Sequence, residues 1–302
     1  MTAATETVEL TEITEPGVYS MPEHLYHRDP VPYGSLSSSG ARLLLPPSTP
    51  AHFRWRQDHP EPGTRAMEIG SAFHTETLGD GPAIERVEAG DWKTKSAREK
   101  ADEARAHDRI PLLAREHDQV LAMAKSVREH DTAGALFERG SGLVEQCLFW
   151  QDPDTQVWCR CRLDFLPHPG APVMYVADLK STFDASEEHA AKALSSFGYH
   201  MQAQWNSTGI KQLRLAEQVV FLFVFVEKDP PHLVHVVTPD ADALAVAADR
   251  NRKAIDVFRR CMETEQWPGY PDGVTTVSLP RWALIQHEVA ADRGDWLTEE
   301  IR

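Results

Sequence analysis

The sequence predicts an α/β fold with a central mixed β-sheet flanked by helices and with an N-terminal helical extension. Residues 143–150, 157–166 and 173–180 are enriched in β-branched, aromatic and alternating residues, which is typical of strands. Residues 219–226 are continuously apolar and predict a strand buried on both faces. Helical patterns precede, separate and follow these strands, and such interleaving indicates an α/β core.

The segment before the strands is predicted to be mainly helical. Residues 36–45 predict a short helix that a serine caps and two prolines end. Residues 69–78 predict a helix with Ser71 as its cap and His74 in its first turn. Residues 94–138 are rich in Ala, Arg, Glu and Lys at helical spacing, and they predict two helices broken at an Ile-Pro pair.

Further elements join and follow the strands. The first two strands predict a hairpin across a turn that begins at Asp152. Helices are predicted at residues 186–209 and 240–264, and another strand at residues 233–238.

The chain is predicted to be one domain between two acidic ends. The domain covers residues 31–285, with a helical part at 35–140 and an α/β core at 141–285. Residues 1–30 hold six acids and one base and predict a disordered arm. Residues 286–302 hold five acids and two bases and predict an acidic tail.

The composition is that of a globular protein without a membrane segment. The chain has 302 residues, of which 41% are hydrophobic, and a net charge of −15. This charge argues against a protein that coats DNA non-specifically, although a local basic groove is compatible with it. The apolar runs are too short to span a bilayer, and the acidic start lacks the features of a signal peptide. We therefore expect a cytoplasmic protein that has no membrane partner.

The four cysteines allow a metal cluster or buried thiols. Cys159 and Cys161 form a close pair, but the sequence contains no CxxC, and alternate residues of a strand chelate one ion poorly. Buried structural thiols are therefore favoured, and we expect no iron–sulfur cluster.

Charged residues end two of the predicted strands. Asp178 and Lys180 project from one face of an otherwise apolar strand, where charge is costly unless it is paired or bound. Asp164 joins them if the two strands are neighbours, and its separation of 14 residues from Asp178 is what two adjacent strands and a turn require. Two carboxylates could hold Mg²⁺ and lower the pKa of a bound water, while the lysine stabilises developing charge. Alone, an Asp-Leu-Lys triplet favours a surface Asp/Lys pair on an edge strand, because such triplets are common.

The ordered set His74, Glu145, Asp164, Asp178-Leu-Lys180 and Gln202 resembles the PD-(D/E)XK nuclease superfamily. It is most similar to the RecB-type branch and, within it, to the exonuclease VIII (RecE-like) group of phage and prophage exonucleases. The resemblance covers residues 33–285 and implies a restriction-endonuclease-like core.

The resemblance implies roles for these residues. Lys180, Asp164, Asp178, Gln202 and His74 would be catalytic. Metal ligands would come from Asp164, Asp178, the Leu179 carbonyl, His74 and Glu145, with Mg²⁺ as cofactor and Mn²⁺ as a possible substitute. DNA contacts would come from Tyr199 and Arg162 in the matching motifs. Arg65 and Lys93 are further candidates for DNA contacts, because they belong to a set of basic residues near His74 that could grip phosphates.

Each weaker candidate has a structural alternative. His74 could be a helix-terminus histidine satisfied by backbone, and Gln202 could face solvent. Glu145 could equally be an exposed strand residue. Asn206 stands where the family has a tyrosine, which leaves the metal site intact but concerns contacts with the substrate strand.

The implied activity is digestion of linear double-stranded DNA from its ends, 5′ to 3′, to expose a single strand for recombination by annealing. The implied partners are double-stranded DNA ends, a RecT-type single-strand annealing protein and further copies of the chain in a homo-oligomer. The alternatives are a CRISPR-adaptation-type or structure-specific endonuclease of the same superfamily, and a catalytically inactive DNA-binding relative.

Overall fold

The structure is a computed structural model that describes residues 12–60 and 63–293. Its contacts divide the chain into two units, Met1–Pro268 and Gly269–Arg302. None of the helices in the described ranges is long and apolar enough to cross a membrane.

The strands of the first unit are β1 (Gly17–Ser20), β2 (Leu36–Ser37), β3 (Ile84–Val87), β4 (Ile110–Leu113), β5 (Gly142–Gln151), β6 (Trp158–Pro167), β7 (Val173–Thr182), β8 (Gln218–Glu227) and β9 (Val234–Val237). They form hydrogen-bonded sheets in the orders β1-β5-β6-β2, β7-β8-β9 and β3-β4. Strand β5 is antiparallel to β1 and β6, whereas β7 is parallel to β8. The mixed topology confirms the predicted fold class.

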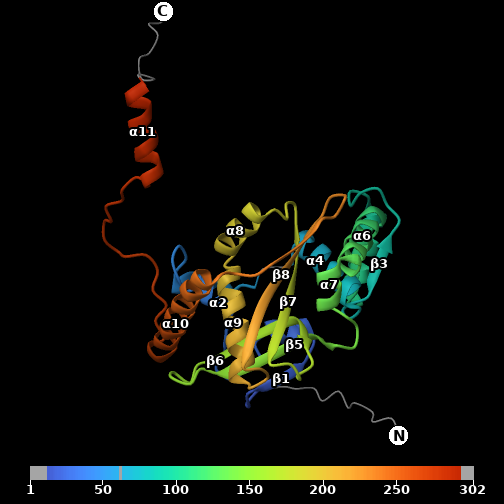
Figure 1. Cartoon of the computed structure of the whole chain (residues 1–302), viewed down its shortest axis with the longest axis horizontal. Helices are drawn as coiled ribbons and strands as arrows, with labels where there is room; N and C mark the ends of the chain where they lie inside the picture. Colours follow the sequence, from blue (N-terminus) through green and yellow to red (C-terminus); the bar gives the residue numbers. More distant parts are fainter. Residues whose placement is uncertain (1–11, 61–62, 294–302) are drawn as a thin grey trace, which may run out of the picture. The chain divides into compact units, whose positions relative to one another are not determined.

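The helices of the first unit are α1 (Glu23–His27), α2 (Ser38–Leu43), α3 (Pro50–Asp58), α4 (Arg65–Leu78), α5 (Lys95–Ala106), α6 (Ala114–Glu129), α7 (Asp131–Leu136), α8 (Glu187–Ser196), α9 (Tyr199–Gln212) and α10 (Ala241–Thr264). Helices α8, α9 and α10 lie on one side of β7 and β8, and α4, α6 and α7 lie on the other (Figure 1). The second unit holds α11 (Arg281–Arg293).

Strand β8 shows why both of these layers are needed. Phe223 and Phe225 are buried in the core that α9 and α10 cover. Val224 and Val226 are buried in a second hydrophobic core, to which residues of α4 and α6 also belong. Because successive strand residues point to opposite faces, a continuous apolar run requires cover on both sides. The prediction from the sequence is confirmed here.

The N-terminal residues differ from the disordered arm that their acidity predicts. Strand β1 pairs with β5, and the segment buries Ile13, Met21, Tyr26 and Val31 in a small core that Cys147 and Phe149 of β5 complete. Asp29 forms an ion pair of 2.5 Å with the buried Arg160. In the described part of this segment, apolar burial and one ion pair stabilise an ordered structure despite the acidic composition. Residues 1–11 lie outside the described residues.

Two other boundaries differ from those predicted. Helix α4 begins at Arg65 and not near Ser71, because the Thr64 side chain caps it by accepting from the Met67 N–H. His74 therefore lies in the middle of a helix rather than in its first turn. The predicted domain end at residue 285 falls inside α11, whereas the first unit ends at Pro268.

Candidate active site

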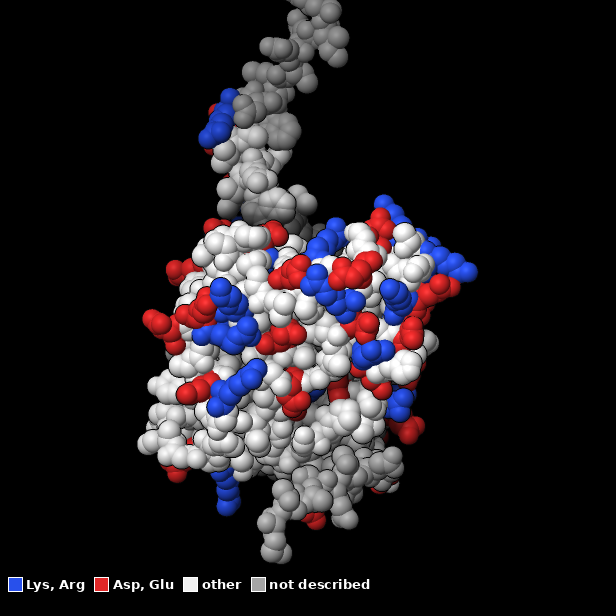
Figure 2. Space-filling model, turned by 90° about the vertical axis from the view of Figure 1, so that its right-hand side faces the viewer, with Lys and Arg blue, Asp and Glu red and all other residues white. Residues whose placement is uncertain are grey.

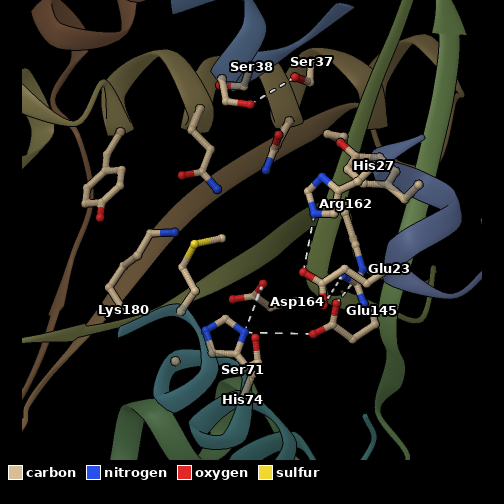
Figure 3. A pocket seen from close by; sticks show the side chains of 18 of the residues that line it. Glu23, His27, Ser37, Ser38, Ser71, His74, Glu145, Arg162, Asp164 and Lys180 are labelled. Carbon is tan, nitrogen blue, oxygen red and sulfur yellow. Dashed lines mark hydrogen bonds and ion pairs between the residues drawn. The ribbon is translucent and has the colours of Figure 1, made fainter. Parts of the chain in front are cut away.

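Three potential metal ligands meet between α4, β5 and β6. His74 Nδ1 lies 3.6 Å from an Asp164 oxygen and 3.9 Å from a Glu145 oxygen. One donor atom from each residue lies within 4.8 Å of the other two. Figure 3 shows the imidazole from the helix pointing at the two carboxylates from the strands. Two carboxylates and an imidazole nitrogen form a donor set that suits a divalent cation.

His74 is held in the tautomer that metal binding needs. Its Nε2 lies 3.0 Å from the Leu179 carbonyl oxygen, a hydrogen bond that requires the proton on Nε2. In the neutral imidazole the lone pair then belongs to Nδ1, which faces Glu145 and Asp164. Metal-ligating histidines commonly donate their second ring N–H to such a carbonyl. The Leu179 carbonyl, expected as a metal ligand, orients the imidazole in this structure.

Glu145 lies where the bridging of β5 to β6 is interrupted. Its backbone has φ +55°, a left-handed conformation that costs a non-glycine residue about 1–3 kcal/mol. The neighbouring pairs Val144–Phe165 and Gln146–Leu163 keep the register of β5 and β6. Glu145 and Asp164, which would oppose each other between those pairs, are not bridged. The strained residue thereby presents its carboxylate to the cluster, so Glu145 is not an exposed strand residue.

Burial makes the ionisation of the Glu145 carboxyl costly. Its pKa is raised from 4.5 to about 7, mainly by desolvation and further by the charge of Asp164. Arg162, whose Nε forms an ion pair of 2.8 Å with Glu145, and His74 act in the opposite direction. Like charges concentrated in a partly desolvated place favour the binding of a cation.

Asp178 and Lys180 form the second part of the site, on β7. Lys180 Nζ makes an ion pair with one Asp178 oxygen, and Gln202 Nε2 donates to the other at 2.6 Å. Burial raises the pKa of Asp178 to about 6 although Lys180 opposes this shift. The pKa of Lys180 is raised because Asp178 and Asp164 together outweigh burial. The predicted common face is confirmed, since both side chains contact α9.

The Asp164 side chain connects the His74–Glu145 part of the site to the Asp178–Lys180 part, where hydrogen-bonded pairing of two strands was expected. Among the described strands, β6 and β7 belong to different hydrogen-bonded sheets, so they are not the ladder neighbours that the spacing predicts. Asp164 Oδ2 instead accepts a hydrogen bond of 2.7 Å from the Leu179 N–H. Asp164 thus touches both His74 and the Asp178–Lys180 strand without a regular ladder.

All of these side chains except the deeply buried Asp178 line one pocket of about 540 Å³. We call it the site pocket and define it by His74, Glu145, Asp164, Lys180 and Gln202. Asn206 also lines it and is buried, with an Oδ1 that has no hydrogen-bond partner among the described residues.

The four expected DNA contacts divide into two groups. Tyr199 and Arg162 line the site pocket. Arg65 does not, because Glu116 and Glu68 engage its guanidinium beside the Trp92 ring. Lys93 is also absent from the pocket, and its side chain is 91% exposed. On the face shown in Figure 2, basic and acidic side chains are interspersed.

Sequence reasoning missed several residues of the site pocket. Glu23 and His27 reach it from α1, and Phe197 reaches it from the turn between α8 and α9. Glu23 and His27 are one helical turn apart and form an ion pair of 3.4 Å. That spacing was the available signal, but it lies in the segment expected to be disordered.

The cysteines are buried core residues, and one of them, Cys161, also lines the site pocket. Cys147, Cys159, Cys161 and Cys261 are free and buried, which confirms the predicted buried thiols. Burial raises the pKa of the Cys147 thiol to about 12, so it stays protonated at neutral pH.

Comparisons with known proteins agree with this geometry. The model of a family described as a PDDEXK-like domain of unknown function (DUF3799) matches residues 49–279. A solved structure of a candidate exonuclease from Eubacterium rectale is similar in fold, with a TM-score of 0.58 and 10% sequence identity. The similarity covers 88% of this chain and 98% of that one. A comparison with curated proteins gave no match.

Proposed function

The chain belongs to the PDDEXK-like family DUF3799, and from that premise we propose that it is a Mg²⁺-dependent exodeoxyribonuclease acting on linear double-stranded DNA. The observation that carries the proposal is one pocket that joins two groups of side chains. His74, Glu145 and Asp164 offer donors for a cation, and Asp164 also contacts the strand of the Asp178–Lys180 pair. A carboxylate cluster beside a half-buried amine suits phosphodiester hydrolysis.

The cation would be held by Glu145, Asp164 and Nδ1 of His74. A bound Mg²⁺ or Mn²⁺ supplies Lewis acidity toward the phosphate and a water of lowered pKa. The carboxylates favour Mg²⁺, and the imidazole makes Mn²⁺ an effective substitute. Asp178 is held by Lys180 and Gln202 and lies buried behind the pocket surface, where its contact with Lys180 positions the amine.

Lys180 is the cation that this chain itself supplies to the reaction. Its ammonium lies 4.8 Å from the centre of the Tyr199 ring and pairs with Asp178. These two contacts fix the flexible side chain, and its raised pKa keeps it charged at neutral pH. From this position the ammonium orients the attacking water and stabilises negative charge on the phosphate.

Action from DNA ends, with 5′ to 3′ polarity, is the finer part of the proposal. It is supported by the motif order that resembles the RecE-like group. The name of the Eubacterium rectale protein supports the exonuclease class but not the polarity. The same resemblance supports a homo-oligomer and a RecT-type annealing partner in a phage recombination system. An adaptation-type nuclease with a cysteine-held cluster is disfavoured, because all four thiols are core residues.

The experiment is a digestion of linear duplex labelled on one strand at a time, with closed-circular duplex as comparison. We expect Mg²⁺-dependent loss of nucleotides from the 5′ ends of linear DNA and an intact circle. Lys180→Ala should abolish the digestion, whereas Lys192→Ala, an exposed lysine on α8, should not. Equal attack on both DNA forms would refute exonuclease action, and no hydrolysis with any metal would refute the nuclease assignment.

A further inference from the structure

One aromatic side chain at the site pocket is exposed. The aromatic residues that line the pocket in the described part of the chain are Tyr26, Phe197 and Tyr199. Tyr26 is buried and Tyr199 is half-buried, but Phe197 is 57% exposed. Single exposed apolar side chains are common on proteins, so the position of this ring is the informative property.

Phe197 lies one ring away from the reactive amine. Its centroid is 5.5 Å from that of Tyr199, and the planes are inclined by 33°. The Tyr199 ring lies over Lys180 Nζ at 4.8 Å and stacks on Phe223 at 5.3 Å. The row of aromatic rings therefore begins at Phe223 in the core, passes the ammonium at Tyr199 and ends at the exposed Phe197.

The backbone holds this ring in place. Gly198 has φ +71°, a left-handed conformation that glycine adopts without strain, and it starts α9. A Cβ at that position would lie 2.7 Å from the Arg42 side chain, so α2 packs directly against the turn. The turn that carries Phe197 is thus fixed between two helices.

We propose that Phe197 is the stacking platform for the nucleobase next to the scissile phosphate, an inference that rests on the proposed function. Every base has a π face, so stacking grips DNA without regard to sequence, as an exonuclease requires. The pocket of about 540 Å³ has the size of a small-molecule site and can admit a nucleotide at a strand end. An aromatic ring near the amine would place the base while the acidic cluster engages the phosphate.

The first test measures stacking without cleavage. Duplexes carry 2-aminopurine at the terminal nucleotide, either 5′ or 3′, and are mixed with Lys180→Ala protein in Mg²⁺. We expect fluorescence quenching for one of the two ends. Adding Phe197→Ala should remove the quenching, and adding Phe197→Trp should restore it. Phe183→Ala is the matched control, because Phe183 is 75% exposed and lies outside the site pocket.

The second test uses cleavage by protein with an intact Lys180. Phe197→Ala should lower kcat/KM about 5- to 150-fold on ordinary ends, the range expected for one stacked base. It should have little effect on a duplex whose terminal nucleotide is abasic. Equal losses on both substrates, or quenching that persists in Phe197→Ala, would overturn the proposal. If the intact enzyme cleaves nothing, the proposed function fails, whereas the quenching result still decides the stacking.

Discussion

Replacement of Glu145 by glutamine tests whether the acidic cluster is unfavourable for the fold until a cation binds. The folded-state pKa of Glu145 is raised from 4.5 to about 7, and its side chain is 21% exposed. Between these two pH values the folded protein retains a proton that the unfolded chain has released. Stability without metal must therefore fall as pH rises through this window. At about 1.36 kcal/mol per pKa unit, the 2.5-unit difference corresponds to about 3 kcal/mol.

Glutamine keeps the shape of the side chain and removes the titration. In EDTA, we expect the free energy of unfolding of Glu145→Gln, relative to the native protein, to increase by about 3 kcal/mol between pH 4.5 and pH 8. With Mg²⁺ or Mn²⁺ at pH 8 the native protein should instead be more stable than the variant, because the native protein gains the free energy of metal binding and the variant loses a ligand. Urea denaturation of both proteins at the two pH values, with and without metal, measures the free energy of unfolding in each of these four conditions. A difference between variant and native protein that does not change with pH would refute the reasoning.

Other parts of the structure give further predictions. Tyr199→Phe should keep the pH–rate profile, whereas Tyr199→Leu should move its alkaline limb to lower pH, because the ring over Lys180 stabilises the charged amine; steady-state rates between pH 7 and 10 measure this shift. Asp29→Asn leaves the buried Arg160 without its ionic partner and should cost about 3–5 kcal/mol in urea denaturation; a loss below 1 kcal/mol would mean that the pair contributes little. Thr64→Ala removes the cap of α4 and should cost about 1 kcal/mol, and an unchanged denaturation midpoint would contradict the capping contact.

Local patterns predicted the parts of the site that lie on regular strands. Alternation along β7 placed Asp178 and Lys180 on one face, and the structure confirms this because both contact α9. Glu145 depends on a left-handed backbone within β5, which side-chain pattern does not encode. The strand pairing of residues 17–20 with β5 was also missed. The segment is acidic overall, and its few apolar residues stabilise a strand only through contacts with β5, which is distant in the sequence.

Arg65 shows what a position in the sequence leaves out. It stands near His74 in the sequence, and a basic residue close to an active-site histidine suggested a DNA contact. The helix directs the Arg65 side chain to Glu116, 51 residues away, where the ion pair is structural. Sequence proximity to His74 did not reveal the direction of the Arg65 side chain.

The N-terminal segment has a practical consequence for protein production. The family match starts at residue 49, and a fragment cut there would lack β1 and β2, which flank β5 and β6. Both outer edges of that sheet would then expose unpaired backbone groups and invite self-association. The fragment would also lose Glu23 and His27, so its pocket would be open on one wall. A recombinant form of the protein should therefore retain residues 12–48, even though a domain definition drawn from the family alone would discard them.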